Sequence, residues 1–142
     1  MASGPAHRSS RSGSSEGGFT MIELLVVISI IVILASMGMV QYRNSVIRAR
    51  EAVLKEDLFR MRDAIDQYYA DKNKYPSSLD DLVTDGYLRE IPVDPITQSK
   101  DTWQVINQEP NVNDATAQPG VYDVKSGSDQ TALDGTRYAD WE

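Results

Sequence analysis

The chain has 142 residues, of which 41% are hydrophobic and 25% charged, a composition typical of one small globular domain. Its formal net charge of −7 argues against a basic face that binds nucleic acid. The absence of cysteine excludes disulfides and thiol catalysis, and the single histidine, His7, lies in the N-terminal leader. A histidine-based metal or acid–base site is therefore excluded from the rest of the chain, and the sequence does not predict an enzyme.

The chain begins with a polar leader and an apolar segment. Residues 1–18 are rich in Ser and Gly without periodicity, so we expect them to be disordered. Residues 19–40 contain one charged side chain, Glu23, and are long enough to cross the roughly 30 Å hydrocarbon core of a bilayer as a helix. A buried strand would be shorter, and a secretory signal peptide would have its small residues after the apolar core. Basic residues before the span and acidic residues after it predict a cytoplasmic N-terminus.

Glu23 lies inside the apolar segment, where a carboxylate is costly unless it is paired or protonated. One interpretation is that it lies near the bilayer edge and snorkels to water. The other is that a partner charge arrives during assembly. If the chain were cut after Gly18, the free α-amine of Phe19 in one subunit could neutralise Glu23 of a neighbour.

The residues around Glu23 also resemble a known processing signal. The segment Gly18-Phe19-Thr20-Met21-Ile22-Glu23-Leu24-Leu25-Val26-Val27 is similar to the class III signal peptides of type IV pilins and of the pseudopilins of type II secretion systems. The resemblance implies that a prepilin peptidase cuts between Gly18 and Phe19 and N-methylates Phe19, and that Glu23 is needed for assembly. Many relatives have Pro near the position of Val40, so Val40 predicts a helix that does not melt there.

Helical spacing continues beyond the membrane segment and predicts one helix from about Thr20 to about Asp71, with residues 41–72 as its amphipathic part. The apolar stripe consists of Ile47, Leu54, Leu58, Met61, Ile65 and Tyr68. The opposite face carries Arg50, Glu51, Lys55, Glu56, Asp57, Arg60, Arg62, Asp63 and Asp66. This charged face is interpreted either as solvated, with weak i,i+4 pairs, or as a surface for charge matching between subunits.

The remaining residues, 73–142, predict a small head with short elements. Tyr75-Pro76 ends the long helix, and Ser77 or Ser78 caps a short helix over Leu79–Thr84 that closes at Gly86. Alternating patterns predict strands over residues 102–106 and 120–124, with a polar loop between them and a turn-rich segment over 125–142. The fold class is therefore α+β: a long N-terminal helix, its first half transmembrane, with a small antiparallel sheet, as in type IV pilins.

The head also resembles the major pseudopilin of type II secretion systems. The similar segments are YYADKNKYPSSLDDL, DGYLREIPVDP and YDVKSGSDQTALDGTRYADW. The resemblance implies that the last of these binds calcium, which takes six to eight oxygen ligands. The candidate ligands are Ser126, Ser128, Asp129, Asp134 and Asp140, with Asp129 the best placed. The alternative is an ordinary solvated acidic loop.

The sequence thus predicts a structural protein whose copies, held in the bacterial inner membrane with the head in the periplasm, polymerise into a pseudopilus that drives protein export. The resemblance implies these partners: further copies of the chain, a prepilin peptidase, minor pseudopilins, an inner-membrane platform protein, a cytoplasmic ATPase and an outer-membrane secretin. One alternative is a type IV pilin of a surface fibre for adhesion, motility or DNA uptake. Another is a membrane-anchored periplasmic binding domain that never polymerises, which the Gly18-Phe19 and Glu23 pattern disfavours.

Overall fold

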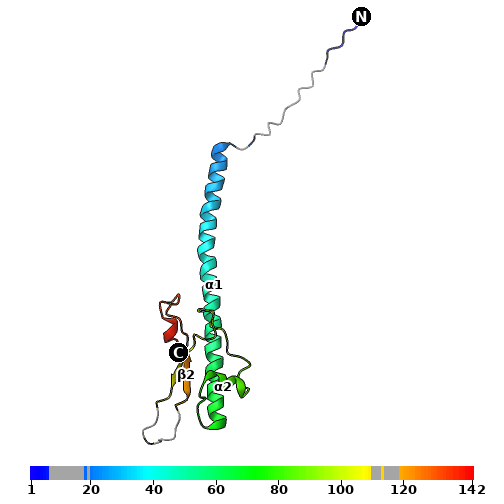
Figure 1. Ribbon diagram of the computed structural model, residues 1–142. Coiled ribbons are helices and arrows are strands. Elements are labelled where there is room, and N and C mark those ends of the chain that lie inside the picture. The colour runs from blue at the N-terminus through cyan, green and yellow to red at the C-terminus, as the bar shows by residue number, and fades with distance from the viewer. Residues whose placement is uncertain (7–17, 19, 110–112, 114–118) are drawn as a thin grey trace. The chain divides into compact units, whose positions relative to one another are not determined.

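The computed structural model of the protein describes residues 1–6, 18, 20–109, 113 and 119–142. Most of the leader, for which disorder was predicted, lies outside these residues, and so does Phe19. Figure 1 shows a long helix, a short helix and a small sheet. The elements are α1 (Met21–Lys72), α2 (Leu79–Thr84), β1 (Gln104–Asn107), β2 (Val121–Lys125) and the 3-10 turn η1 (Tyr138–Asp140). The predicted α+β class, with one long N-terminal helix, is confirmed.

Helix α1 is continuous over 52 residues, which corresponds to about 78 Å at 1.5 Å per residue. It begins one residue after Thr20, whose hydroxyl accepts a hydrogen bond from the Glu23 amide at 3.2 Å. The helix runs through Val40 without a break, as the absence of proline predicted. It ends at Lys72 because Asn73 takes a left-handed conformation, with φ of 53°.

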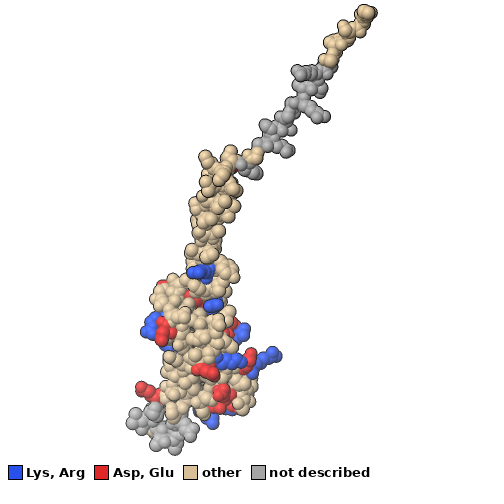
Figure 2. Space-filling model, turned by 45° about the horizontal axis from the view of Figure 1, so that its top comes forward, with Lys and Arg blue, Asp and Glu red and all other residues tan. Residues whose placement is uncertain are grey.

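The first part of α1 has no protein neighbours among the described residues. Every residue from Met21 to Arg43 is exposed. An 18-residue window of the helix has a mean hydropathy of 2.6, so by length and composition α1 could cross a membrane. In Figure 2 the visible face of the upper part of this helix is tan, whereas charged side chains of both signs appear on the head. An apolar surface of this size needs lipid or other protein to cover it.

The second part of α1 supplies the core of the head, as the apolar stripe predicted. Leu54, Met61 and Ile65 are fully buried, and Leu58 and Tyr68 are at most 5% exposed. Ile47, the first residue of the stripe, is half-buried. The core is completed by Ala64, Leu79, Leu82, Trp103, Val121, Val124, Ala132 and Tyr138. These residues come from every other element except β1, so the rest of the head packs on α1.

The two strands form one antiparallel sheet and confirm the predicted pair, each shifted toward the C-terminus. Gln104 pairs with Lys125 and Val105 with Val124, and the register shifts between Ile106 and Asn107. Val121 and Val124 of β2 point into the core, whereas Val105 of β1 is exposed. Strand β2 therefore connects the sheet to α1, and the C-terminal loop (residues 126–142) follows directly from it.

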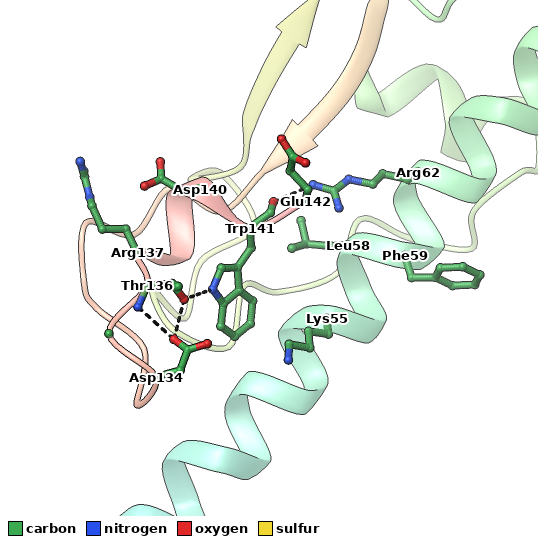
Figure 3. Close-up of a pocket in the computed structure, with 11 residues that line it drawn as sticks. Lys55, Leu58, Phe59, Arg62, Asp134, Thr136, Arg137, Asp140, Trp141 and Glu142 are labelled. Atoms are coloured by element: carbon green, nitrogen blue, oxygen red, sulfur yellow. Dashed lines mark hydrogen bonds between the residues drawn. The ribbon is translucent and has the colours of Figure 1, made fainter.

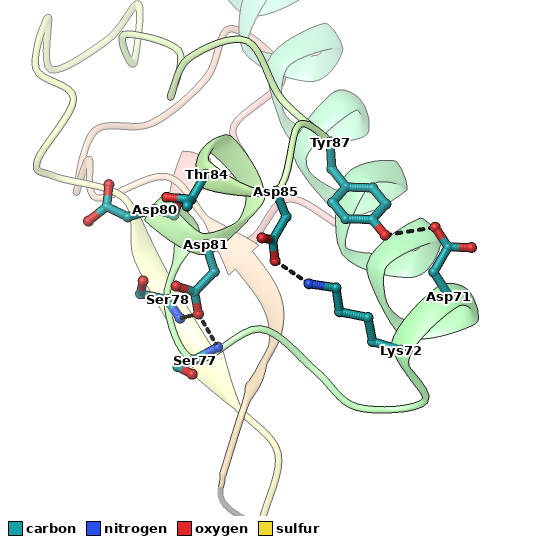
Figure 4. Close-up of polar contacts among 9 residues, drawn as sticks. All are labelled: Asp71, Lys72, Ser77, Ser78, Asp80, Asp81, Thr84, Asp85 and Tyr87. Carbon is teal, nitrogen blue, oxygen red and sulfur yellow. Dashed lines mark hydrogen bonds and ion pairs between the residues drawn. The ribbon is translucent and has the colours of Figure 1, made fainter.

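Helix α2 is fixed to the end of α1 by polar contacts shown in Figure 4. Lys72 forms an ion pair with Asp85, and the Tyr87 hydroxyl donates to Asp71 at 2.7 Å. Ser78 is the N-cap residue of α2, as its sequence predicted, and the Asp81 carboxylate accepts hydrogen bonds from the amides of Ser77 and Ser78 at 2.9 and 3.3 Å. Gly86 closes the helix with φ of 83°, a conformation that glycine adopts without strain.

Candidate functional site

The predicted assembly residue Glu23 lies in the first turn of α1. Its side chain is exposed, and its position near the N-terminal end of the helix dipole favours a negative charge. Thr20 lies three residues earlier and caps the helix, a role that the sequence interpretation did not assign. The Thr-x-x-Glu spacing typical of a capping box could have shown it. A Cβ atom added at Gly18 would meet no other atom within 4 Å, and Phe19 lies outside the described residues.

The polar side chains in the middle of the apolar helix are satisfied internally. The hydroxyl of Ser29 donates to the carbonyl of Leu25 at 2.7 Å, and that of Ser36 donates to the carbonyl of Val32 at 2.7 Å. Such bonds remove the cost of placing a hydroxyl in a medium without water. Glu23 is therefore the one ionisable group that residues 21–40 would bring into an apolar environment.

The start of the C-terminal loop is bound to a buried aspartate that the sequence analysis did not single out. Ser126 and Asp94 are both fully buried, and the Ser126 hydroxyl donates to Asp94 Oδ2 at 2.6 Å. Asp94 Oδ1 accepts from the amides of Ile96 and Thr97 at 2.8 and 3.4 Å, which makes an Asx turn. The dipeptide Asp94-Pro95 could have indicated this turn in the sequence, because Asp before Pro favours turn initiation.

The end of the loop is bound to α1 by Arg62. Its Nε donates to Asp123 Oδ1 at 2.8 Å, and its Nη2 donates to the carbonyls of Val124 and Trp141 at 3.1 and 2.9 Å. The Arg62 side chain is 25% exposed, so these bonds are partly shielded from water. One guanidinium thus holds β2 and the last residues of the chain against the same helix.

Glu51 and Lys55 hold the middle of the loop. Glu51 Oε1 accepts from the Tyr138 hydroxyl and from the Leu133 amide, both at 2.9 Å. Burial, and then the bond to Glu51, raise the pKa of Tyr138 to about 12. The Lys55 ammonium lies 4.9 Å from the centre of the Trp141 ring, within the range of a cation–π interaction.

The charged face of α1 is therefore not uniformly solvated. Arg60 and Glu56 form an exposed i,i+4 pair, as predicted. The prediction of a solvated face was wrong for Asp57, which is buried, and for Glu51 and Arg62, which are half-buried and bind the C-terminal loop. Lys55 is exposed, as predicted, but also contacts Trp141 of that loop. Glu51, Lys55 and Arg62 border the apolar stripe, so their side chains reach any segment that packs on it.

A cavity of about 890 Å³ lies between α1 and the C-terminal loop, and Figure 3 shows its lining. Asp134 lies beside the Trp141 ring, and its Oδ1 accepts from the Thr136 hydroxyl and amide at 2.6 and 2.9 Å. These bonds lower the pKa of Asp134. The Asp140 carboxylate points away from Asp134 in the same view.

The predicted calcium ligands are consequently spread over the loop. Asp129 forms a weak, exposed ion pair with Arg137 at 3.4 Å, and Ser126 is directed at Asp94. The Ser128 hydroxyl accepts from the amide of Gln130 at 3.2 Å. Within the described part of the chain, no three acidic or histidine side chains come close enough to hold a metal ion together. The described side chains do not fit the predicted site, and calcium binding itself stays a prediction.

Comparisons with known proteins agree with the N-terminal signal and with the head. The family described as the prokaryotic N-terminal methylation motif matches residues 13–39. The type II secretion system core protein G of Pectobacterium carotovorum subsp. carotovorum is 34% identical over 101 residues, which are 60% of this chain and 65% of that protein. The core protein G of Pseudomonas aeruginosa is 35% identical over 96 residues, 56% of this chain and 68% of that protein.

A fimbrial relative matches less of the chain. The type IV major fimbrial protein FimA of Dichelobacter nodosus is 38% identical over 61 residues, 43% of this chain and 38% of that protein. No solved structure matches the chain. The chain spans about two thirds of the length of the core G proteins, at 65% and 68%. By its methylation motif, its long apolar helix and this coverage, the chain belongs to the family of the type II secretion system core protein G.

Proposed function

We propose that this protein is a structural subunit, not an enzyme, whose copies assemble through their apolar helices into a pseudopilus that drives protein export in type II secretion. The observation that carries the proposal is the first part of α1. Its large hydrophobic side chains are between 46% and 79% exposed, and most of it lies within the methylation motif matched over residues 13–39. A surface of this kind is stable in lipid while the subunit is stored, and in contact with other copies once assembled.

Glu23 supplies a reason for the helices to leave lipid and associate. Apolar helices gain little from the hydrophobic effect on association in a bilayer, because lipid tails are as apolar as leucine. An unpaired carboxylate in that environment is costly, and a cationic partner at a neighbouring N-terminus relieves the cost. Cleavage after Gly18 would create such a partner at Phe19, as the sequence analysis suggests.

The processing and topology of the subunit follow from the same segment. We propose that a prepilin peptidase cleaves between Gly18 and Phe19 and methylates Phe19. The subunit then spans the inner membrane with its N-terminus in the cytoplasm and its head in the periplasm. Minor pseudopilins, a membrane platform protein, a cytoplasmic ATPase and a secretin are the proposed partners of the assembled filament.

A type IV pilin of a surface fibre is the second candidate. The fimbrial relative is matched over 61 residues against 101 for a core protein G. The longer match to the core protein G therefore favours secretion. A long surface fibre produced without any effect on protein export would favour the pilin.

The test is a pair of substitutions in the full-length chain, expressed together with the other genes of a type II secretion system. We expect Glu23→Val to accumulate in the membrane while filaments, seen by electron microscopy, and export are lost. Ser29→Val is the matched control, because it also makes the span more apolar but keeps the acid. Normal filaments from Glu23→Val would show that Glu23 only snorkels, and the proposed assembly mechanism would be rejected.

A further inference from the structure

We propose that the C-terminal loop of this chain is held on the head by a protein-only latch, formed by Asp94 and by Glu51, Lys55 and Arg62 of α1, so that it closes without calcium. The proposal concerns the head alone and does not rest on the proposed function. It starts from the contacts that fix the loop at three places: its beginning, its middle and its end.

The beginning of the loop has little freedom to rearrange around an ion. The Ser126 hydroxyl is fully buried, donates to Asp94 and accepts from the Ser128 amide at 3.3 Å. At Gly127 the backbone passes so close to the carbonyl of Thr102 that an added side chain would overlap it. The side-chain hydroxyls of Ser126 and Ser128 are therefore already used in bonds within the protein.

The middle and the end of the loop are held by Glu51 and Arg62, which lie about three helical turns apart on α1. Glu51 binds Leu133 and Tyr138, and Arg62 binds the carbonyl of Trp141. Tyr138 is 3% exposed and packs edge-on against Trp141, with 5.1 Å between ring centres. The bonds from Glu51 and Arg62 thus fix an aromatic pair of which Tyr138 belongs to the core and Trp141 packs against it, partly buried.

Basic side chains already lie beside several of the acidic groups in and next to the loop. Asp123 faces Arg62 at 2.8 Å, and Asp129 faces Arg137. The charge of Lys55 contributes to the lowered pKa of Asp134. A divalent cation bound to Asp129 or Asp134 would have to compete with the positive charge of Arg137 or Lys55 beside that carboxylate.

The experiment measures the melting temperature of the full-length chain, purified in detergent, with calcium chloride at millimolar concentration or with EDTA. We expect the melting temperature to be the same in both. A site filled at one hundred times its Kd would raise the melting temperature of a head of this size by roughly 10–20 °C. Such a rise, abolished by Asp129→Asn, would overturn the proposal in favour of calcium binding.

The second measurement asks whether α1 holds the loop. Hydrogen exchange in EDTA should show protected amides at Leu133 and Tyr138, and Arg62→Gln and Glu51→Ala should each reduce that protection. Arg60→Gln and Glu56→Ala are the matched controls, because that pair lies on the same helix but is exposed and does not contact the loop. Unprotected amides in EDTA, or equal effects from the latch and control variants, would also overturn the proposal.

Discussion

The buried Asp94 is the residue whose replacement should most clearly reveal how the head is held together. Its carboxylate is fully buried and receives three hydrogen bonds, from the amides of Ile96 and Thr97 and from the hydroxyl of Ser126. Asp94→Ala would leave the buried Ser126 hydroxyl and the half-buried amides of Ile96 and Thr97 without this acceptor. A donor left without an acceptor costs about 1–3 kcal/mol, so the loss of all three bonds should cost at least about 3 kcal/mol.

Asp94→Asn removes the negative charge but keeps an oxygen acceptor at the same position. Its amide oxygen can still accept from Ile96 and Thr97, and its amide nitrogen can donate to Ser126, whose hydroxyl is also an acceptor. We therefore expect a loss of about 1 kcal/mol for Asn, and about 1–2 kcal/mol for Ser126→Ala, which removes one bond. For a head of this size, Asp94→Ala should lower the melting temperature by at least about 12 °C.

The assay is thermal unfolding of the full-length chain in detergent, followed by the fluorescence of Trp103. This indole donates to the carbonyl of Pro92 at 2.7 Å, next to the Asp94 turn, and so reports on it directly. A Trp141→Phe background in every variant leaves Trp103 as the sole tryptophan. If Asp94→Asn destabilised the head as much as Asp94→Ala, the charge and not the set of acceptors would be responsible, and the reasoning would be refuted.

Three further predictions concern processing, pH and packing. Gly18→Leu should block cleavage, because a bulky side chain crowds the peptidase at the scissile bond. Intact-mass spectrometry should find residues 1–18 retained, and a variant chain that lacks them would contradict the prediction. The pKa of Tyr138 is raised to about 12, so its contribution to stability should be constant below about pH 10 and fall between pH 10 and 12. Urea unfolding across this range should show a smaller fall for Tyr138→Phe. Gly127→Ala should cost about 1–3 kcal/mol because its side chain would overlap the carbonyl of Thr102, and an unchanged urea midpoint would count against that contact.

The sequence predicted the helices well because their signals are local. The stripe that includes Leu54 and Tyr68 has the helical period, and Ser78 marks the start of α2, so both helices lie within one residue of their predicted bounds. The strands were found with less accuracy, because short alternating patterns fix the pairing but not the ends.

The contacts of the C-terminal loop could not be predicted from the sequence. Arg62 and Trp141 are separated by 79 residues, and no periodicity connects them. In the sequence, Arg62 is one charge among many on a helix face, and only the packing of the loop on the stripe distinguishes it from Arg60. The acids of the loop suggested a common ligand set, whereas the backbone directs them to separate partners.

The distance along the chain between these contacts has a consequence for biogenesis. The bond between Glu51 and Tyr138 joins residues 87 positions apart, and α1 meets its core partners Val121, Val124, Ala132 and Tyr138 only once β2 and the segment after it have been made. A head with such non-local contacts closes slowly and only when nearly the whole chain is available. During synthesis, the apolar segment emerges first, long before the head can fold. We therefore expect the head to cross the bilayer as an unfolded polypeptide and to fold after transfer, while the membrane already holds the other end of the same helix.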